Sequence, residues 1–295
     1  MAFDYKKEYK EFYMPLKKPG ILSIVMGVYA ICFAFRVLEY FFLRTDQTVF
    51  GEAFIHKLIG IIILFAAAKY DGFSSEKIGF SNKKMLKNTL KGLGFGLSVF
   101  ALAYSVEIII LAVRGRFASI SVYVSAYSVD GNIGNQTAFI FFVMCIVGNI
   151  INVVMEEGMF RGLFQKILEK KYSFVIAAVI ASSLFGLWHI MSPFRSYCND
   201  TMSIGGFVAN SVMLVATSSL VGFKFAMMTK LTGNLYMATG DHFVNNTIVN
   251  VLHVISDTGA DQMQVVRISI AQSVSFVIVL VWHLMKKKEA MTNAV

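Results

Sequence analysis

Three side chains suited to acid–base chemistry lie close together in the middle of the chain. Glu156, Glu157 and Arg161 directly follow a run, Asn135 to Val154, that contains no charged residue. A charged side chain placed in hydrocarbon costs about 2.5–3.5 kcal/mol on insertion scales. Carboxylates kept in such surroundings are candidates for general acid–base catalysis, because a positioned carboxylate can take a proton from water.

Two histidines and an amide occur in similarly apolar surroundings. His189 ends the segment FGLWHI, and His242 and Asn246 lie within HFVNN. A spacing of four residues places His242 and Asn246 on one face of a helix, and the same spacing lets Glu157 pair with Arg161. An acid, two imidazoles and an amide are the side chains that a hydrolase needs.

The spacing also predicts different roles for the two glutamates. Glu157 can be held ionised by Arg161, whereas Glu156 is rotated by about 100° and can face His189 in drier surroundings. A carboxylate and an imidazole beside water can deprotonate it. The histidine and amide of HFVNN can donate hydrogen bonds to a developing oxyanion. Each feature alone could be an interfacial salt bridge or an ordinary helix contact, but three motifs on three segments favour a catalytic site.

The composition predicts the setting of this site. The chain has 295 residues, of which 56% are apolar or aromatic and 15% are charged, and its mean hydropathy is +0.64. Soluble domains carry about 25% charged residues. We therefore predict an all-α, polytopic membrane protein that forms a single domain over residues 1–295. Its three cysteines are scattered and indicate neither a disulfide framework nor a metal site.

Eight apolar segments approach the ~20 residues that a membrane-spanning helix needs. They are residues 20–43, 53–69, 92–113, 136–160, 173–190, 204–229, 234–255 and 267–285. The fourth and fifth are joined by a short turn near Lys171, which predicts an antiparallel hairpin. Glu156 and His189 lie 15 and 18 residues from that turn. At ~1.5 Å per residue, they reach depths of roughly 23 and 27 Å, which are nearly equal.

The basic residues are distributed unevenly about these segments. With the N-terminus inside, 20 of the 27 Lys and Arg residues fall in inner segments and 6 in outer ones. This asymmetry fits the positive-inside rule and predicts cytoplasmic termini. The net charge of +9 is then a signal of topology and of lipid contact, so we expect a lipid bilayer as partner and no nucleic acid.

Other polar residues inside the segments have simpler explanations. Arg36 and Glu39 lie three residues apart on the first segment and could pair with each other or with Glu107 on the third. Asn149 and Asn152 on the fourth segment could form hydrogen bonds with neighbouring helices.

The three motifs together resemble a known family. EEGMFRG fits EExxxR, Phe185 to His189 fits FxxxH, and His242 to Asn246 fits HxxxN. In this order, on separate spans, they are similar to those of the CPBP intramembrane proteases. That family includes the Rce1-type CAAX prenyl proteases and the bacterial Abi proteins, which are linked to bacteriocin processing or self-immunity. The resemblance covers roughly residues 136–255, which we take as the catalytic core, and it implies an Rce1-like helical bundle.

The resemblance also implies a role for each residue. Glu156 would activate the attacking water together with His189, and His242 and Asn246 would stabilise the oxyanion. The second glutamate and the arginine of EExxxR would organise the site.

A metal is an open alternative. Glu156, His189 and His242 could bind a divalent ion such as zinc, since catalytic zinc commonly has three protein ligands and a water. The HExxH signature is absent from the sequence, however. We therefore expect no obligatory metal.

The predicted function is that of an intramembrane endopeptidase. It would hydrolyse a peptide bond in a hydrophobic or membrane-associated peptide or small protein. The alternatives are a non-catalytic scaffold or a bacteriocin-immunity or regulatory protein that retains the pocket, and a transporter, because intramembrane charges also mark ion paths. We expect an integral protein of a bacterial plasma membrane; its substrate and oligomeric state are left open.

Overall fold

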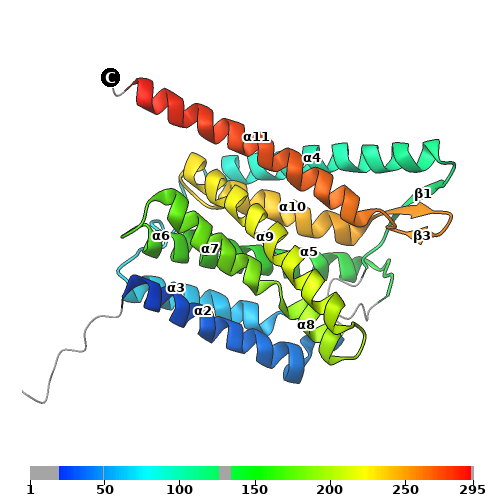
Figure 1. Cartoon of the computed structure of the whole chain (residues 1–295), viewed down its shortest axis with the longest axis horizontal. Coiled ribbons are helices and arrows are strands. Elements are labelled where there is room, and N and C mark those ends of the chain that lie inside the picture. Colours follow the sequence, from blue (N-terminus) through cyan, green and yellow to red (C-terminus); the bar gives the residue numbers. More distant parts are fainter. Residues whose placement is uncertain (1–19, 49, 126–133, 294–295) are drawn as a thin grey trace, which may run out of the picture.

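The computed structural model describes residues 20–48, 50–125 and 134–293. Long helices dominate this part of the chain and lie alongside one another in an elongated bundle (Figure 1). The first half of the bundle comprises α2 (Ile21–Leu38), η1 (Glu39–Leu43), η2 (Thr45–Gln47), α3 (Ile55–Tyr70), α4 (Met85–Val113), α5 (Phe139–Glu156), η3 (Glu157–Phe164) and α6 (Gln165–Leu168). The second half comprises α7 (Phe174–Trp188), α8 (Met191–Cys198), α9 (Ile204–Thr232), α10 (Tyr236–Val251) and α11 (Gln264–Thr292). The predicted all-α polytopic fold is confirmed.

Each of the eight predicted segments contains a helix. By length and composition, six helical stretches of the described chain could cross a membrane. They are Ile21–Gln47, Met85–Val113, Phe139–Leu168, Phe174–Cys198, Ile204–Thr232 and Gln264–Thr292. Helices α3 and α10 have 16 residues each, fewer than the ~20 that a full crossing needs.

The predicted seventh segment, 234–255, is too long at its C-terminal end. Helix α10 ends at Val251, and the chain continues as strand β2 (Leu252–Ser256). β2 pairs antiparallel with β1 (Phe117–Val122) and with the short β3 (Gly259–Ala260). The β-branched residues of LHVIS suit a strand, but their apolar character alone does not distinguish a strand from the end of a span.

A network of charges lies between this sheet and the adjoining helices. Arg267 donates to Glu107 at 2.7 Å and to Asp261 at 2.8 Å, so Glu107 does not pair with the first helix as one alternative proposed. Asp261 lies outside the spanning helices and also contacts His253. Burial alone would raise the pKa of Asp261, but hydrogen bonds from His253 and Arg267 outweigh that effect and leave its pKa below its ordinary value.

Helix α10 occupies the middle of the bundle and packs against α4, α5 and α9. Two glycines bring the backbones of α4 and α10 together. A Cβ on Gly92 would lie 2.2 Å from the Met237 carbonyl oxygen, and one on Gly240 would lie 2.7 Å from the Thr89 carbonyl oxygen. Because both positions lack a side chain, α10 can settle against α4, and its opposite face then turns toward α5.

Helices α5, η3 and α6 follow one another without a break, and α7 returns along them as predicted. Residues 169–173 form the turn, and Ser173 caps α7 by accepting a hydrogen bond from the Ile176 amide at 3.5 Å. Aromatic rings fill the interface, where Phe160 contacts both Phe185 and Trp188. This hairpin carries two of the three motifs.

The start of α2 and the end of α11 lie at the same end of the bundle (Figure 1). This arrangement agrees with an even number of passes. The five lysines counted on the inner side at the N-terminus, Lys6, Lys7, Lys10, Lys17 and Lys18, lie outside the described residues.

Candidate active site

The EExxxR motif lies where α5 becomes the π-helical segment η3. π-Helical segments are rare in proteins, and those that do occur are often found at functional sites. All eight residues of η3 are buried. A Cβ on Gly158 would lie 2.5 Å from Leu64 Cδ2, and one on Gly162 would lie 2.7 Å from the Ile78 carbonyl oxygen. The segment is therefore pressed against α3 and the following loop, which fixes the direction of its charged side chains.

The predicted pair of Glu157 and Arg161 is present. Arg161 Nε donates to Glu157 Oε2 at 2.6 Å, and Nη2 donates to Oε1. Both side chains are 0% exposed. The guanidinium carbon also lies 4.2 Å from the ring centroid of Phe185 and 5.2 Å from that of Phe225. The pair thus sits in an apolar, aromatic shell that contains little to compete with it.

Glu157 has a second partner that the residue spacing did not predict. Its Oε1 lies 2.7 Å from Nδ1 of His242 on α10. The His242 ring stacks on Phe225, with centroids 4.9 Å apart and planes 25° apart. Because an ionised carboxylate only accepts hydrogen bonds, Nδ1 carries the hydrogen. Nε2 is then the nitrogen free for chemistry, and stacking and hydrogen bonding together fix where it points.

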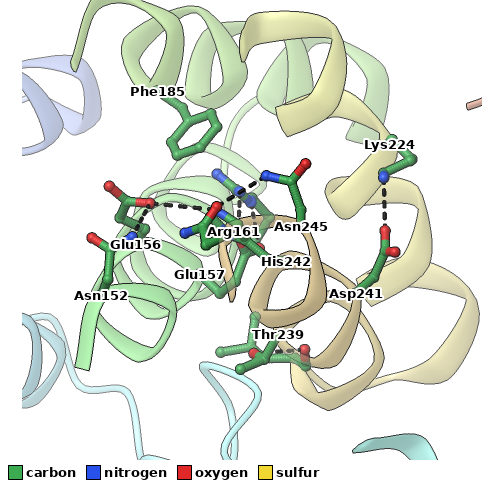
Figure 2. Close-up of polar contacts among 12 residues, drawn as sticks. Asn152, Glu156, Glu157, Arg161, Phe185, Lys224, Thr239, Asp241, His242 and Asn245 are labelled. Carbon is green, nitrogen blue, oxygen red and sulfur yellow. Dashed lines mark hydrogen bonds and ion pairs between the residues drawn. The ribbon is translucent and has the colours of Figure 1, made fainter. Parts of the chain in front are cut away.

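That nitrogen faces Glu156. His242 Nε2 lies 3.6 Å from Glu156 Oε2, so Arg161, Glu157, His242 and Glu156 form a continuous polar chain from α5 and η3 to α10 (Figure 2). Glu156 is 3% exposed. Its Oε2 also accepts a hydrogen bond from Asn152 Nδ2, one helical turn earlier, at 3.3 Å. Asn152 therefore forms its hydrogen bond within its own helix rather than with a neighbouring one, and its four-residue spacing from Glu156 is the sequence signal of this contact.

His189 is placed differently from the expectation. It caps the C-terminal end of α7, and its Nδ1 lies 2.8 Å from the Phe185 carbonyl oxygen. A carbonyl only accepts, so Nδ1 carries the hydrogen here too. The histidine in direct proximity to the Glu156 carboxylate is His242. The turn back toward Phe185, which follows from the end of α7 at Trp188, accounts for the difference.

Asn246 lies one turn beyond His242 on α10, as its spacing predicts. Its Oδ1 accepts a hydrogen bond from Asn245 Nδ2 at 2.9 Å, and Asn245 in turn accepts from Gln272 on α11 at 2.8 Å. Asn246 is half-buried. Its role at an oxyanion stays a prediction.

The three residues considered as metal ligands do not fit a metal site. Within the described ranges, no group of three or more His, Cys, Asp or Glu side chains has the arrangement needed to hold a metal ion. Glu156 and His242 are close, but His189 does not complete a set with them.

Comparison with known proteins bears on the same region. A protein-family model described as type II CAAX prenyl endopeptidase Rce1-like matches residues 138–248. This range contains all three motifs and extends from the start of α5 into α10. A search of curated proteins finds no match.

Proposed function

We propose that this chain, which matches the Rce1-like type II CAAX prenyl endopeptidase model over residues 138–248, is an intramembrane endopeptidase that uses Glu156 to activate water. Its substrate would be a hydrophobic or membrane-associated peptide. One observation carries the proposal. A buried Glu156 faces Nε2 of a histidine whose other nitrogen is held by the Glu157–Arg161 pair.

The geometry supports a simple proton path. The distance of 3.6 Å between Glu156 Oε2 and His242 Nε2 is too long for a hydrogen bond, but one water can contact both atoms. Glu156 takes a proton from that water while the water oxygen forms a bond to the scissile carbonyl carbon. When the carbon–nitrogen bond breaks, the same proton passes to the leaving nitrogen. The products are a carboxylic acid and an amine, so every atom of the water is accounted for.

The neighbouring residues would support this step. Glu157 fixes the tautomer of His242, and Arg161 offsets the charge of Glu157, so only one carboxylate of the motif faces the water. Asn246 can donate to the developing oxyanion directly through its amide. His189 can do so through Nε2 only when that ring is protonated, because its Nδ1 hydrogen is used by Phe185.

The test is the Glu156→Gln variant, which keeps the size of the side chain and removes the base. The purified protein in lipid vesicles is given a quenched-fluorescent, farnesylated peptide that ends in a CAAX sequence. Because general-base catalysis contributes about 10²–10⁴-fold, we expect kcat to fall by at least about 100-fold.

The matched control is Glu169→Gln. Glu169 follows α6 on the same helical stretch and pairs with Lys166 at 2.8 Å, away from the motif residues. We expect this variant to cleave at the rate of the unaltered protein. Cleavage by Glu156→Gln at that same rate would refute the mechanism. An unaltered protein that binds peptides without cleaving them would support the non-catalytic alternative.

A further inference from the structure

Arg36 on α2 is a buried cation whose charge has no carboxylate partner among the described residues. The residue is 7% exposed. Its Nη2 donates to the Tyr40 hydroxyl at 3.3 Å. Its Nε and Nη1, which carry three N–H groups, have no hydrogen-bond partner in the described parts of the chain. Arginine is almost never fully buried unless it is paired, so this arrangement calls for an explanation.

Four other buried cations in the described part of the chain have a carboxylate partner. Lys57 lies 3.0 Å from Glu52, Lys224 lies 2.7 Å from Asp241, and Arg267 lies 2.7 Å from Glu107. Arg161 has Glu157. The chain therefore generally places a carboxylate beside a buried positive charge, and Arg36 departs from that pattern.

The expected partner of Arg36 is engaged elsewhere. Glu39 accepts hydrogen bonds from the backbone amides of Ile55, at 2.9 Å, and His56, at 2.6 Å, which lie at the start of α3. It also contacts His56 Nδ1 at 2.6 Å. The predicted pair of Arg36 and Glu39 is therefore wrong, because Glu39 caps a helix terminus whose amides need an acceptor.

Stacking explains only part of the position of Arg36. Its guanidinium carbon lies 4.5 Å from the ring centroid of Trp188 and 5.1 Å from that of Tyr40. Contacts of this kind use the flat face of the guanidinium, whereas its N–H groups point outward from the edge. Stacking thus orients the group and leaves its edge to hydrogen-bond acceptors. Nη2 gives one hydrogen to Tyr40, and its second hydrogen, together with Nε or Nη1, can form a bidentate contact with a carboxylate.

A second unmatched donor lies beside it. Trp188 is 1% exposed, and its Nε1–H has no hydrogen-bond partner among the described residues. Trp188 directly precedes His189, and its ring centroid lies 6.0 Å from that of Phe160, a residue of the EExxxR motif. The unmatched Nε2 of His56 is not a donor in the neutral ring, because its Nδ1 hydrogen faces Glu39. Two side chains with unmatched N–H donors therefore lie beside the candidate active site.

We propose that Arg36 and Trp188 form an anion subsite that receives a carboxylate group of the substrate peptide next to Glu156. The proposal rests on the proposed function and adds a feature of the substrate, a negative charge held by α2 and α7. The carboxylate could come from the C-terminus of the peptide or from an acidic side chain. Arg36 is a positioning residue in this scheme, since it binds the substrate away from the bond that breaks.

The test measures binding rather than cleavage and uses the Glu156→Gln protein in lipid vesicles. Three fluorescent apolar peptides of the same length serve as probes: one with a free C-terminus, one with an amidated C-terminus, and one amidated peptide with a single aspartate near its end. We expect at least one carboxylate-bearing probe to bind ten times more tightly than the neutral amide. Tight binding of the free acid alone would assign the C-terminus, and tight binding of the aspartate probe would assign a side chain.

Variants then identify the residue responsible. Adding Arg36→Gln should weaken binding of the preferred carboxylate probe by at least tenfold and leave the neutral amide unchanged. Trp188→Phe, which keeps a ring and removes the N–H, should cause a smaller loss of the same kind. The control is Arg116→Gln, an exposed arginine that pairs with Asp257 at 2.9 Å and should change nothing.

Two results would overturn the subsite. One is equal binding of all three probes with Arg36 intact, a comparison that does not depend on the folding of a variant. The other is equal weakening of acid and amide by Arg36→Gln. Failure of the subsite is distinguishable from failure of the proposed function, because loss of cleavage in Glu156→Gln is measured separately.

Discussion

Removal of one member of the Glu157–Arg161 pair should destabilise the protein strongly. Both side chains are 0% exposed, and the pair is joined by two hydrogen bonds. In Arg161→Met, Glu157 keeps only its contact with His242, at 2.7 Å. Loss of one partner of a buried pair typically costs about 3–5 kcal/mol, because the other charge stays buried without compensation. We expect Arg161→Met and Glu157→Gln each to lower the free energy of unfolding by about this amount.

The double variant should be far less destabilised than the sum of the two single variants. Once both charges are absent, no uncompensated charge remains, and replacing a buried pair by neutral groups is often tolerated. The coupling energy between the two substitutions should therefore reach about 3 kcal/mol. Activity should not recover with stability, since His242 loses the ionised partner that fixes its Nδ1 hydrogen.

Reversible unfolding in mixed micelles, titrated with SDS and followed by tryptophan fluorescence, gives these free energies. The control cycle uses Lys166 and Glu169, whose side chains are 30% and 20% exposed and lie 2.8 Å apart. Partly exposed pairs couple by about 0–1 kcal/mol. If the coupling energy between Glu157 and Arg161 is no larger than that of the control pair, water must reach this charge pair. That result would refute the reasoning.

Two further predictions concern the elements around the site. Gly92→Ala should lower the free energy of unfolding by about 1–3 kcal/mol in the same titration, because its Cβ would lie 2.2 Å from the Met237 carbonyl oxygen. Gly94→Ala, with nothing within 4 Å of its Cβ, should be neutral or stabilising, and equal effects of the two substitutions would contradict this account. Asp261, whose pKa is lowered by folding, stabilises the protein when ionised and loses that contribution as the pH falls below its ordinary pKa of about 3.9. The difference in thermal stability between the unaltered protein and Asp261→Asn should therefore shrink below about pH 4, whereas a difference that stays constant from about pH 7 to 3 would contradict the assignment.

Local spacing predicted those parts of the site that lie on one helix. The Glu157–Arg161 pair follows from a separation of four residues, and the hairpin follows from a short turn between two apolar runs. Such contacts depend only on helix geometry, so they can be predicted from a short stretch of sequence. Asn152 belongs to the same class, because it contacts Glu156 one turn away.

Contacts between helices were harder to predict. His242 lies beside both glutamates because α10 settles against α4 at Gly92 and Gly240, which sets the rotation of α10 about its axis. The sequence HFVNN alone does not indicate how α10 is rotated about its axis. Strand β2 is a similar case, since its hydrogen-bonding partner β1 lies more than 120 residues earlier in the chain.

The environment of Arg36 is also set by a contact between helices, and it bears on how a substrate could bind. A spacing of three residues favoured pairing with Glu39, but the free amides at the start of α3 compete for the same carboxylate and take it. The unpaired cation is thus a consequence of how α2 and α3 meet. Glu156, at the end of α5, accepts its hydrogen bond from an amide, Asn152 Nδ2. The carboxylate of Glu156 and the cation of Arg36 lie on different helices and do not pair with each other, so each can contact a third molecule. A peptide that carries a carboxylate close to the bond to be broken would pair with Arg36 while the water activated by Glu156 attacks that bond.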